Sequence, residues 1–365
     1  MKKRLVSILQ LALGIGLIVF LYLRMENKDD LFNAVQAIAT HWPYLVGAVL
    51  PFLGCILLCT WRWRLILAAH DMHLPFWRTL ELYFIGQFFN AFMFGSIGGD
   101  LVKVFFVAKA FPHKRTEAVT TVFIDRLMGL LALIALIGVI LAIRFRFFLR
   151  YPETRAVMAF MIAGLLTTIV GLIVVFQQNV FEHWAFFQRL EQNTALGKTI
   201  RRVYDAFHTC LTHHGLLIKV LTLSMVNHIT IVVAALLLGL GLNIRTVQSP
   251  PTSHLSPPTT ELRTPNSEPR TPIHLAAEFG NYLTVFPIVN GIAAIPATPG
   301  GLGTREYATQ FLLGVPEFNV PATRTIPLSL LLYATTLFWS LIGGVVYAAH
   351  TLRAGKTIAL PNMQG

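Results

Sequence analysis

The chain has 365 residues, of which 55% are hydrophobic and only 13% are charged. A soluble domain carries about 25% charged residues, so this composition excludes an ordinary soluble protein and indicates an integral membrane protein. The formal net charge is +12, but the cations fall in short loops between apolar segments. This distribution is typical of residues that orient membrane helices, and it does not indicate binding to nucleic acid.

Apolar segments long enough to cross a membrane recur along the chain, since a helical crossing needs roughly 20 residues. The first, residues 5–23, is too long for a signal peptide and is predicted to stay in the protein. Two weaker segments, residues 80–97 and 275–296, run directly into glycine clusters. The pattern predicts an all-α, polytopic membrane protein with six to eight transmembrane helices. The other strong segments are residues 44–60, 118–143, 156–176, 216–242 and 326–350.

Each weaker segment ends in a break with the pattern hydroxyl-x-Gly-Gly-x-x-x-cation. Paired breaks of membrane helices in the two halves of a transporter indicate a substrate site. Both weaker segments could dip into the membrane and return on the same side. Each half would then hold three spans, and because three is odd, the second half would be inverted relative to the first, which predicts an inverted repeat. The two sets are Ser96, Gly98, Gly99 and Lys103, and Thr298, Gly300, Gly301 and Arg305.

The distribution of cations favours re-entry over eight full spans. With a cytoplasmic N-terminus, re-entry leaves more Lys and Arg on the cytoplasmic side, as the positive-inside rule requires. The weak point of this topology is a group of four arginines that it places outside. They are Arg144, Arg146, Arg150 and Arg155.

The breaks offer a site for a lipid phosphate, because a helix that starts after Gly-Gly presents free N–H groups and the positive end of its dipole. Lys103 and Arg305 lie within about one turn of these helix starts. The alternative is an ordinary helix N-terminus, where the carboxylates of Asp100 and Glu306 are favoured anyway. The predicted headgroup-binding residues are Gly98, Gly99, Lys103, Gly300, Gly301, Gly303 and Arg305.

Two adjacent charges, Asp125 and Arg126, lie inside an apolar segment. A charge there costs about 2.5–3.5 kcal/mol on insertion scales. Neighbours on a helix point about 100° apart, so each is expected to meet a partner on another element. The alternative is a structural ion pair near the membrane interface that only fixes packing. The expected partners are Lys103 or Arg305 for Asp125, and Glu306 or Asp100 for Arg126.

Several other segments have a distinct composition. Residues 243–272 hold seven prolines among Ser and Thr and no aromatic residue, which predicts a disordered insertion. Residues 196–211 carry an apolar stripe typical of a helix on an anionic membrane face or on the protein's own spans. Residues 61–64, Trp-Arg-Trp-Arg, indicate an interfacial anchor with cytoplasmic charge, and residues 353–365 form a short tail.

Motifs of known catalytic sites are missing from the sequence. It contains no serine elbow, phosphate loop, metalloprotease motif or carboxylate pair suited to hydrolysis. Cys55 and Cys59 are interpreted as buried, inert thiols. No catalytic residue, no metal site and no cofactor is therefore predicted.

Three stretches resemble the lysylphosphatidylglycerol synthase transmembrane region, also called the flippase-like domain family. They are residues 95–103, residues 118–131 with Asp125 and Arg126, and residues 299–306. With the helix pattern, the resemblance covers about residues 5–352, interrupted by the insertion at 243–272. It implies a multi-pass protein of a bacterial-type inner membrane that handles anionic or isoprenoid-linked lipids. The soluble domain that transfers lysine from tRNA in the synthases has no counterpart here, so aminoacyl transfer is not expected.

The leading hypothesis is a translocator of an anionic or isoprenoid-linked (glyco)lipid. Its phosphate headgroup would meet Lys103, Arg305 and the glycine-break amides in a cavity between the two halves, while Asp125 and Arg126 exchange partners. One alternative is a non-transporting partner of a glycosyltransferase or lipid-modifying enzyme, docked through residues 198–211. Another is an intramembrane enzyme that acts on polyprenyl phosphate with Asp125 as the base.

Overall fold

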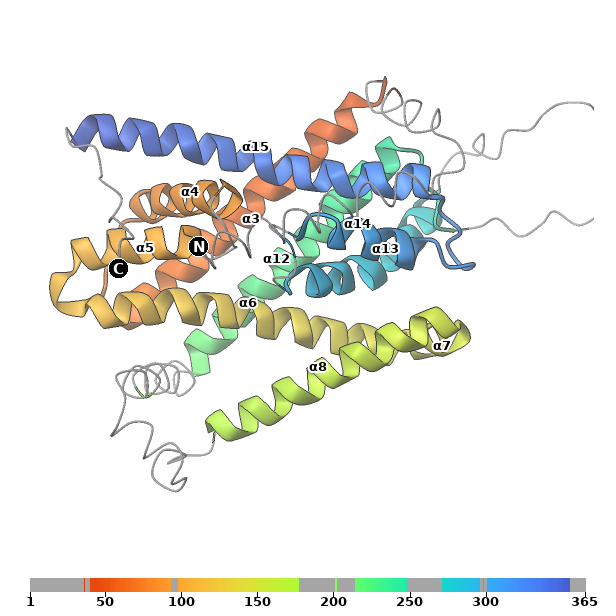
Figure 1. The fold of residues 1–365 in the computed structure, drawn as a ribbon, viewed down its shortest axis with the longest axis horizontal. Helices are drawn as coiled ribbons and strands as arrows, with labels where there is room; N and C mark the ends of the chain where they lie inside the picture. The colour runs from red at the N-terminus through yellow and green to blue at the C-terminus, as the bar shows by residue number, and fades with distance from the viewer. Residues whose placement is uncertain are drawn as a thin grey trace, which may run out of the picture. The chain divides into compact units, whose positions relative to one another are not determined.

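The computed structural model describes Gln36, Thr40, Arg201, Thr298 and five longer stretches, residues 41–92, 98–176, 214–247, 271–295 and 301–354. These residues form ten α-helices, one 3-10 helix and no strand, which confirms the all-α fold (Figure 1). The helices are α3 (Trp42–Ala69), α4 (Phe76–Phe92), α5 (Gly98–Ala110), η1 (Pro112–Lys114), α6 (Arg115–Ile143), α7 (Phe145–Arg150), α8 (Pro152–Phe176), α12 (His214–Gly241), α13 (Pro272–Ala293), α14 (Thr304–Leu313) and α15 (Ala322–Ala354).

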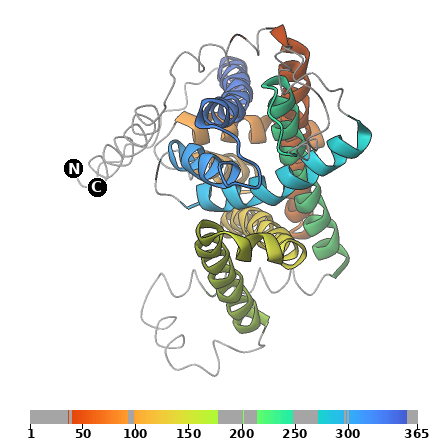
Figure 2. The same cartoon turned by 90° about the vertical axis from the view of Figure 1, so that its right-hand side faces the viewer.

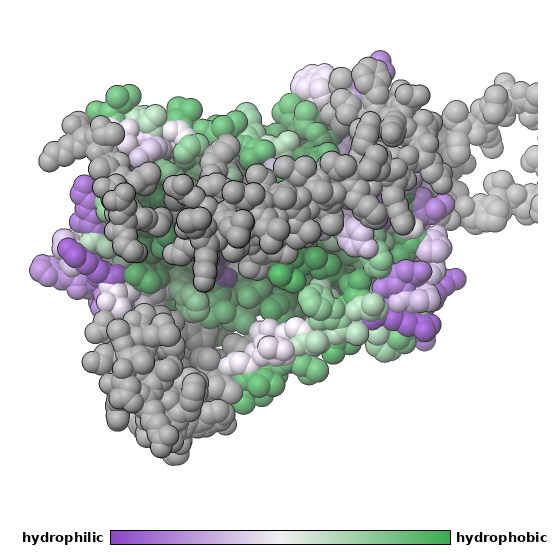
Figure 3. Space-filling model, viewed as in Figure 1, coloured by the Kyte–Doolittle hydropathy of each residue, from purple (hydrophilic) through white to green (hydrophobic). Residues whose placement is uncertain are grey.

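Five helices, α3, α6, α8, α12 and α15, are long and apolar enough to cross a membrane. Each coincides, to within one residue, with one of the strong apolar segments predicted from the sequence or contains it, and the remaining strong segment, residues 5–23, lies outside the described residues. Large apolar side chains of α8, including Phe160, Leu166 and Val170, are more than half exposed. Figure 3 shows mostly hydrophobic side chains along α8, as expected for a helix in contact with lipid.

The described chain divides into two compact units. Unit 1 draws on residues 1–52, 134–164 and 228–334, and unit 2 draws on residues 53–133, 165–227 and 335–365. Helices α13 and α14 belong wholly to unit 1, and α4 and α5 wholly to unit 2. The order of elements is repeated: a long helix, two further helices on either side of a glycine break, and another long helix. This repetition, α3 to α6 and then α12 to α15, supports an internal repeat, while inversion of the second copy stays a prediction.

In unit 2, α4 and α5 form a hairpin that returns the chain to the side from which it came. Lys114, at the end of η1, donates from Nζ to the carbonyl of His70, 3.0 Å away, so the chain before α4 lies beside the chain after α5. The helices have 17 and 13 residues, or about 26 and 20 Å at 1.5 Å per residue. Both are shorter than the roughly 30 Å hydrocarbon core, which agrees with re-entry, and re-entry itself stays a prediction.

The hairpin packs against the long helices of unit 2 through a continuous apolar core. Trp63 and Leu67 of α3, Ile85 of α4, Val107 of α5 and Ala118 of α6 are all fully buried in one cluster. Burial of aromatic and aliphatic side chains from four helices holds the break in one place, because interiors of this kind are close-packed.

In unit 1, α13 and α14 form the corresponding pair. The connection that follows α12 is held against them, since Asn281 Nδ2 donates to the carbonyl of Thr246 at 3.2 Å and Arg324 donates to the carbonyl of Asn243 at 2.7 Å. Residues 243–247 are therefore ordered, and the prediction of disorder from Asn243 onward is wrong for these five residues. Residues 248–270 lie outside the described part of the chain.

Helices α6 and α8 meet at the short helix α7, where the chain reverses direction (Figures 1 and 2). Thr154 donates from Oγ1 to the carbonyls of Phe148 and Tyr151, both at 2.9 Å, which ties the start of α8 to α7. The amphipathic segment predicted at residues 196–211 lies outside the described residues except for Arg201, and residues 355–365 also lie outside them.

Candidate functional site

The first glycine break opens α5 with two buried glycines, Gly98 and Gly99. A Cβ on Gly99 would lie 1.8 Å from the carbonyl oxygen of Gly86 on α4, so the two helix backbones are in contact there. The N–H of Gly99 donates to Asn90 Oδ1 at 2.8 Å. This amide was predicted to receive a lipid phosphate, but a side chain of α4 already caps it.

Beside this break, one carboxylate is shared by two cations. Arg126 donates from Nε to Asp100 Oδ2 at 2.7 Å. Lys103 Nζ lies 3.1 Å from Asp100 Oδ1, an ionic contact without the alignment of a hydrogen bond. Lys103 is only 4% exposed, whereas the Arg126 side chain is 49% exposed. Two cations therefore share the Asp100 carboxylate, and Asp100 is confirmed as an expected partner of Arg126.

Lys103 is further stabilised by aromatic rings. Its Nζ lies 5.1 Å from the ring centroid of Trp63 and 4.9 Å from that of Tyr83. A cation over an aromatic face recovers part of the solvation that burial removes. Gly86 leaves room for the lysine stem, because a Cβ there would lie 2.9 Å from Lys103 Cγ.

Asp125 has a partner that the sequence did not suggest. Arg62 of α3 donates from Nε to Asp125 Oδ1 at 2.7 Å, and its Nη1 donates to Ser224 Oγ of α12 at 2.9 Å. Both charged side chains are buried. The expectation that Lys103 or Arg305 pairs with Asp125 is therefore wrong.

The prediction of an interfacial anchor at residues 61–64 needs a matching correction. Arg62 and Trp63 are buried, and only Trp61 and Arg64 are exposed. The physical reason is that a buried carboxylate requires a cation, and Asp125 holds Arg62 inside the unit.

The second break uses its glycines differently. Gly301 and Gly303 have φ angles of +74° and +81°, a region where side chains are strained. The N–H of Gly303 donates to Glu306 Oε2 at 2.5 Å, and Ser329 donates to Glu306 Oε1 at 3.0 Å. Glu306 therefore caps the start of α14, which is the alternative considered for it, and both its oxygens are used within unit 1. Gly300 lies outside the described residues.

Arg305 occupies the position in the second break that Lys103 occupies in the first. Its guanidinium carbon lies 5.8 Å from the ring centroid of Tyr333 on α15. Each break thus sets a cation against an aromatic ring. The two breaks differ at one acidic position, because Asp100 of the first corresponds to the apolar Leu302 in the second.

Among the site residues, sequence reasoning missed Arg62, Ser224, Trp63 and Tyr83. Arg62 had a usable signal, a cation within an apolar helix, but its aromatic neighbours favoured an interface.

Cys59 Sγ donates to Asn227 Oδ1 at 3.5 Å, and both Cys55 and Cys59 are buried free thiols, as predicted. Among the described residues, no group of His, Cys, Asp and Glu is arranged to hold a metal ion.

Comparison with known proteins places the chain in a family. The model of the lysylphosphatidylglycerol synthase TM region matches residues 7–249. This match includes the first glycine break, Asp125 and Arg126, while the second break lies beyond it. No curated protein and no solved structure matches the chain. Because the match covers more than half of the chain, the protein belongs to the family of the lysylphosphatidylglycerol synthase transmembrane region.

Proposed function

We propose that the protein binds the phosphate of an anionic or isoprenoid-linked (glyco)lipid and moves its headgroup across a bacterial-type inner membrane. The observation that carries this proposal is the sharing of Asp100 by Lys103 and Arg126. Charge is costly in a low-dielectric site unless it is balanced. A phosphodiester is an anion that can take the place of Asp100 beside one of these cations, and the family makes a lipid the natural source.

The two cations suit different parts of the task. Arg126 is half exposed, and a guanidinium grips a phosphate through parallel N–H groups. Lys103 is buried and acts as a point charge behind it. An arriving phosphate competes with Asp100 for both cations, and Asp100 takes them back on release. Because one anion replaces another beside the cations, such exchange favours reversible binding.

The remaining predicted residues take supporting roles in this proposal. Arg305, set on Tyr333, provides a cation of the same kind in unit 1. The amides of Gly99 and Gly303 are bonded to Asn90 and Glu306, so they serve the fold and not the headgroup. The proposal needs no catalytic residue and no cofactor.

The test is headgroup movement in proteoliposomes that contain fluorescent phosphatidylglycerol and an external quencher. Wild-type protein is expected to take quenching beyond one half, because inner-leaflet lipid becomes accessible. Arg126→Gln is expected to stop quenching at one half, and Arg126→Lys to retain part of the activity. Arg115→Gln is the matched control, since Arg115 is an exposed arginine on the same helix. Normal activity of folded Arg126→Gln would remove this cluster from the mechanism.

A different outcome would contradict translocation itself. Wild-type quenching could stop at one half with phosphatidylglycerol and with polyprenyl phosphate, both with and without a proton gradient. The non-transporting role beside a membrane-bound enzyme would then replace the present proposal. Co-purification of such an enzyme with the full chain would be the next measurement.

A further inference from the structure

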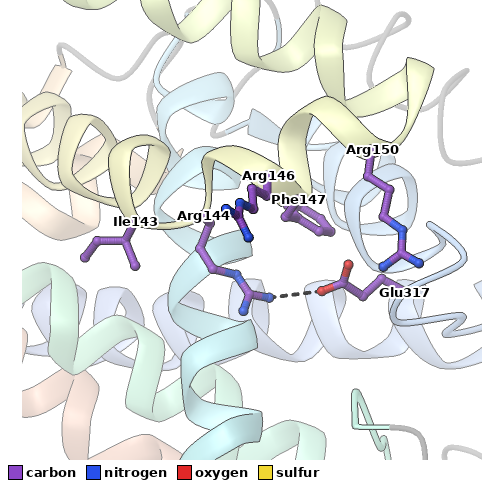
Figure 4. Close-up of a pocket in the computed structure, with 6 residues that line it drawn as sticks. All are labelled: Ile143, Arg144, Arg146, Phe147, Arg150 and Glu317. Carbon is purple, nitrogen blue, oxygen red and sulfur yellow. Dashed lines mark hydrogen bonds and ion pairs between the residues drawn. The ribbon is translucent and has the colours of Figure 1, made fainter.

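The corner between α6 and α8 forms a basic pocket that the sequence analysis did not assign to any function. It has a volume of about 280 Å³ and is open on one side. Figure 4 shows that its arginine side chains extend from the corner toward the connection between α14 and α15. The lining residues are Ile143, Arg144, Arg146, Phe147, Arg150 and Glu317.

The wall of this pocket is held by aromatic packing inside unit 1. Phe147 and Phe148 are buried, and the Phe147 ring lies 5.3 Å from the ring of Phe318. Phe318 adjoins Glu317, so this contact fixes the distance between the two sides of the pocket. The shape is therefore set by the fold before any ligand arrives.

The charges in the pocket are unbalanced. Arg144 donates from Nη2 to Glu317 Oε1 at 3.2 Å and to Asn281 Oδ1 at 3.1 Å, so the single carboxylate is engaged. Arg146 and Arg150 are exposed, and neither forms an ion pair within the residues that the structure describes. Three guanidinium groups around one carboxylate make a strong anion site, because each offers several N–H donors in a fixed plane.

The pocket also lies where lipid headgroups are found. Helix α6 ends at Ile143 and α8 begins at Pro152, and both are candidate membrane spans. The corner that joins them therefore lies at a membrane boundary. Ile143, Phe145 and Leu149 are exposed there, at 76%, 49% and 40%. Apolar side chains interleaved with cations suit the depth at which acyl chains meet phosphates.

We propose that this pocket binds a phosphate anion, presented by a membrane lipid, between Arg146 and Arg150. Its residues are not those of the glycine breaks, so binding here does not depend on translocation. The proposal also gives a role to Arg144, Arg146 and Arg150, which the re-entrant topology places outside although the positive-inside rule disfavours cations there.

The test is a binding titration of the full-length protein in a neutral detergent. Short-chain phosphatidylglycerol, phosphatidylcholine with the same chains, and inorganic phosphate are titrated in separate arms. Arg146→Gln/Arg150→Gln is expected to weaken phosphatidylglycerol binding at least about tenfold, since it removes two charge-assisted contacts. The control Lys109→Gln/Arg115→Gln removes the same net charge at exposed cations outside the pocket and is expected to bind like wild type.

A variant that is expected to raise the affinity separates a binding role of the pocket from a merely structural one. Glu317→Gln removes the only carboxylate of the pocket and is expected to tighten phosphatidylglycerol binding, while Asn281 still holds Arg144. Unchanged affinity in the Arg146/Arg150 variant, equal loss in the control, or weaker binding in Glu317→Gln would each overturn the proposal. Binding of phosphatidylglycerol that excess inorganic phosphate does not displace identifies a lipid as the ligand, and full displacement identifies a soluble phosphate.

Discussion

Charged side chains in the helices of unit 2 are held in two arrangements, which differ in the number of cations that contact each carboxylate. Arg62 and Asp125 form a one-to-one pair, supported by Ser224. Asp100 is divided between Lys103 and Arg126. A balanced buried pair favours a fixed structure, whereas a shared carboxylate can release a cation to a ligand. For this reason the proposed function places lipid binding at the second arrangement and gives the first a structural role.

Replacing Arg62 tests the structural role of the balanced pair. Arg62→Met leaves the Asp125 carboxylate buried without its cation, which is expected to cost about 3–5 kcal/mol and lower the thermal midpoint in detergent. Arg62→Met/Asp125→Leu removes both charges and is expected to recover most of that loss. Thermal unfolding of each variant is followed by tryptophan fluorescence. If Arg62→Met is as stable as wild type, the structural role of the pair is contradicted.

The cap at the second break allows a prediction at Glu306. Glu306→Ala frees the Gly303 amide and is expected to destabilise the protein by about 1–2 kcal/mol. Glu153→Ala is the matched control, because Glu153 also lies in the first turn of a helix but is exposed. Thermal unfolding of both variants measures the difference. If the thermal midpoints of the two variants fall equally, Glu306 does not stabilise the protein by capping α14.

At the scale of elements, the two hairpins share a sequence pattern but depend on glycine for different reasons. In the α4–α5 hairpin, Gly99 permits backbone contact with Gly86. In the α13–α14 hairpin, Gly301 and Gly303 adopt positive φ angles. The first break therefore needs glycine for close packing of two helices, and the second needs it for the backbone conformation. The cation four residues after the second glycine is what the two copies have in common.

Gly99→Ala tests the close approach of α4 and α5. The new methyl group would lie 1.8 Å from the Gly86 carbonyl oxygen, so the helices must separate and folded protein is expected to be lost. Gly164→Ala in α8 is the control, because no atom lies within 4 Å of its Cβ position. This control is expected to gain about 0.5–1 kcal/mol from higher helix propensity. Monodisperse elution of Gly99→Ala at the wild-type yield would refute the close contact.

At the scale of the whole molecule, the α4–α5 hairpin predicts which connections share a membrane face. The connections before α4 and after α5 lie on one face, because Lys114 bonds to His70. If α6 crosses the membrane, as its length and apolar composition allow, the α7 corner is expected on the opposite face. The positive-inside rule predicts that the first of these faces is cytoplasmic.

Cysteine labelling tests this topology. In a variant without the three native cysteines, single cysteines at Asp71 and His113 are expected to react with an impermeant maleimide from the cytoplasmic side only. A cysteine at Glu153, next to α7, is expected to react from the other side only. All three positions are exposed. Labelling of positions 71 and 113 from opposite sides would mean that the hairpin spans the membrane.

The sequence by itself determined the class of the protein, the five described spans, the position of both breaks and the family, because these depend on local composition, apolar length and short motifs. Only the tertiary structure decided which groups meet. Arg62 and Asp125 are 63 residues apart, and Arg144 and Glu317 are 173 apart. No local period records such pairings, because they arise when separate helices pack. For the same reason, only the structure showed that Asn90 and Glu306 occupy the amides that the glycine pattern had offered to a phosphate.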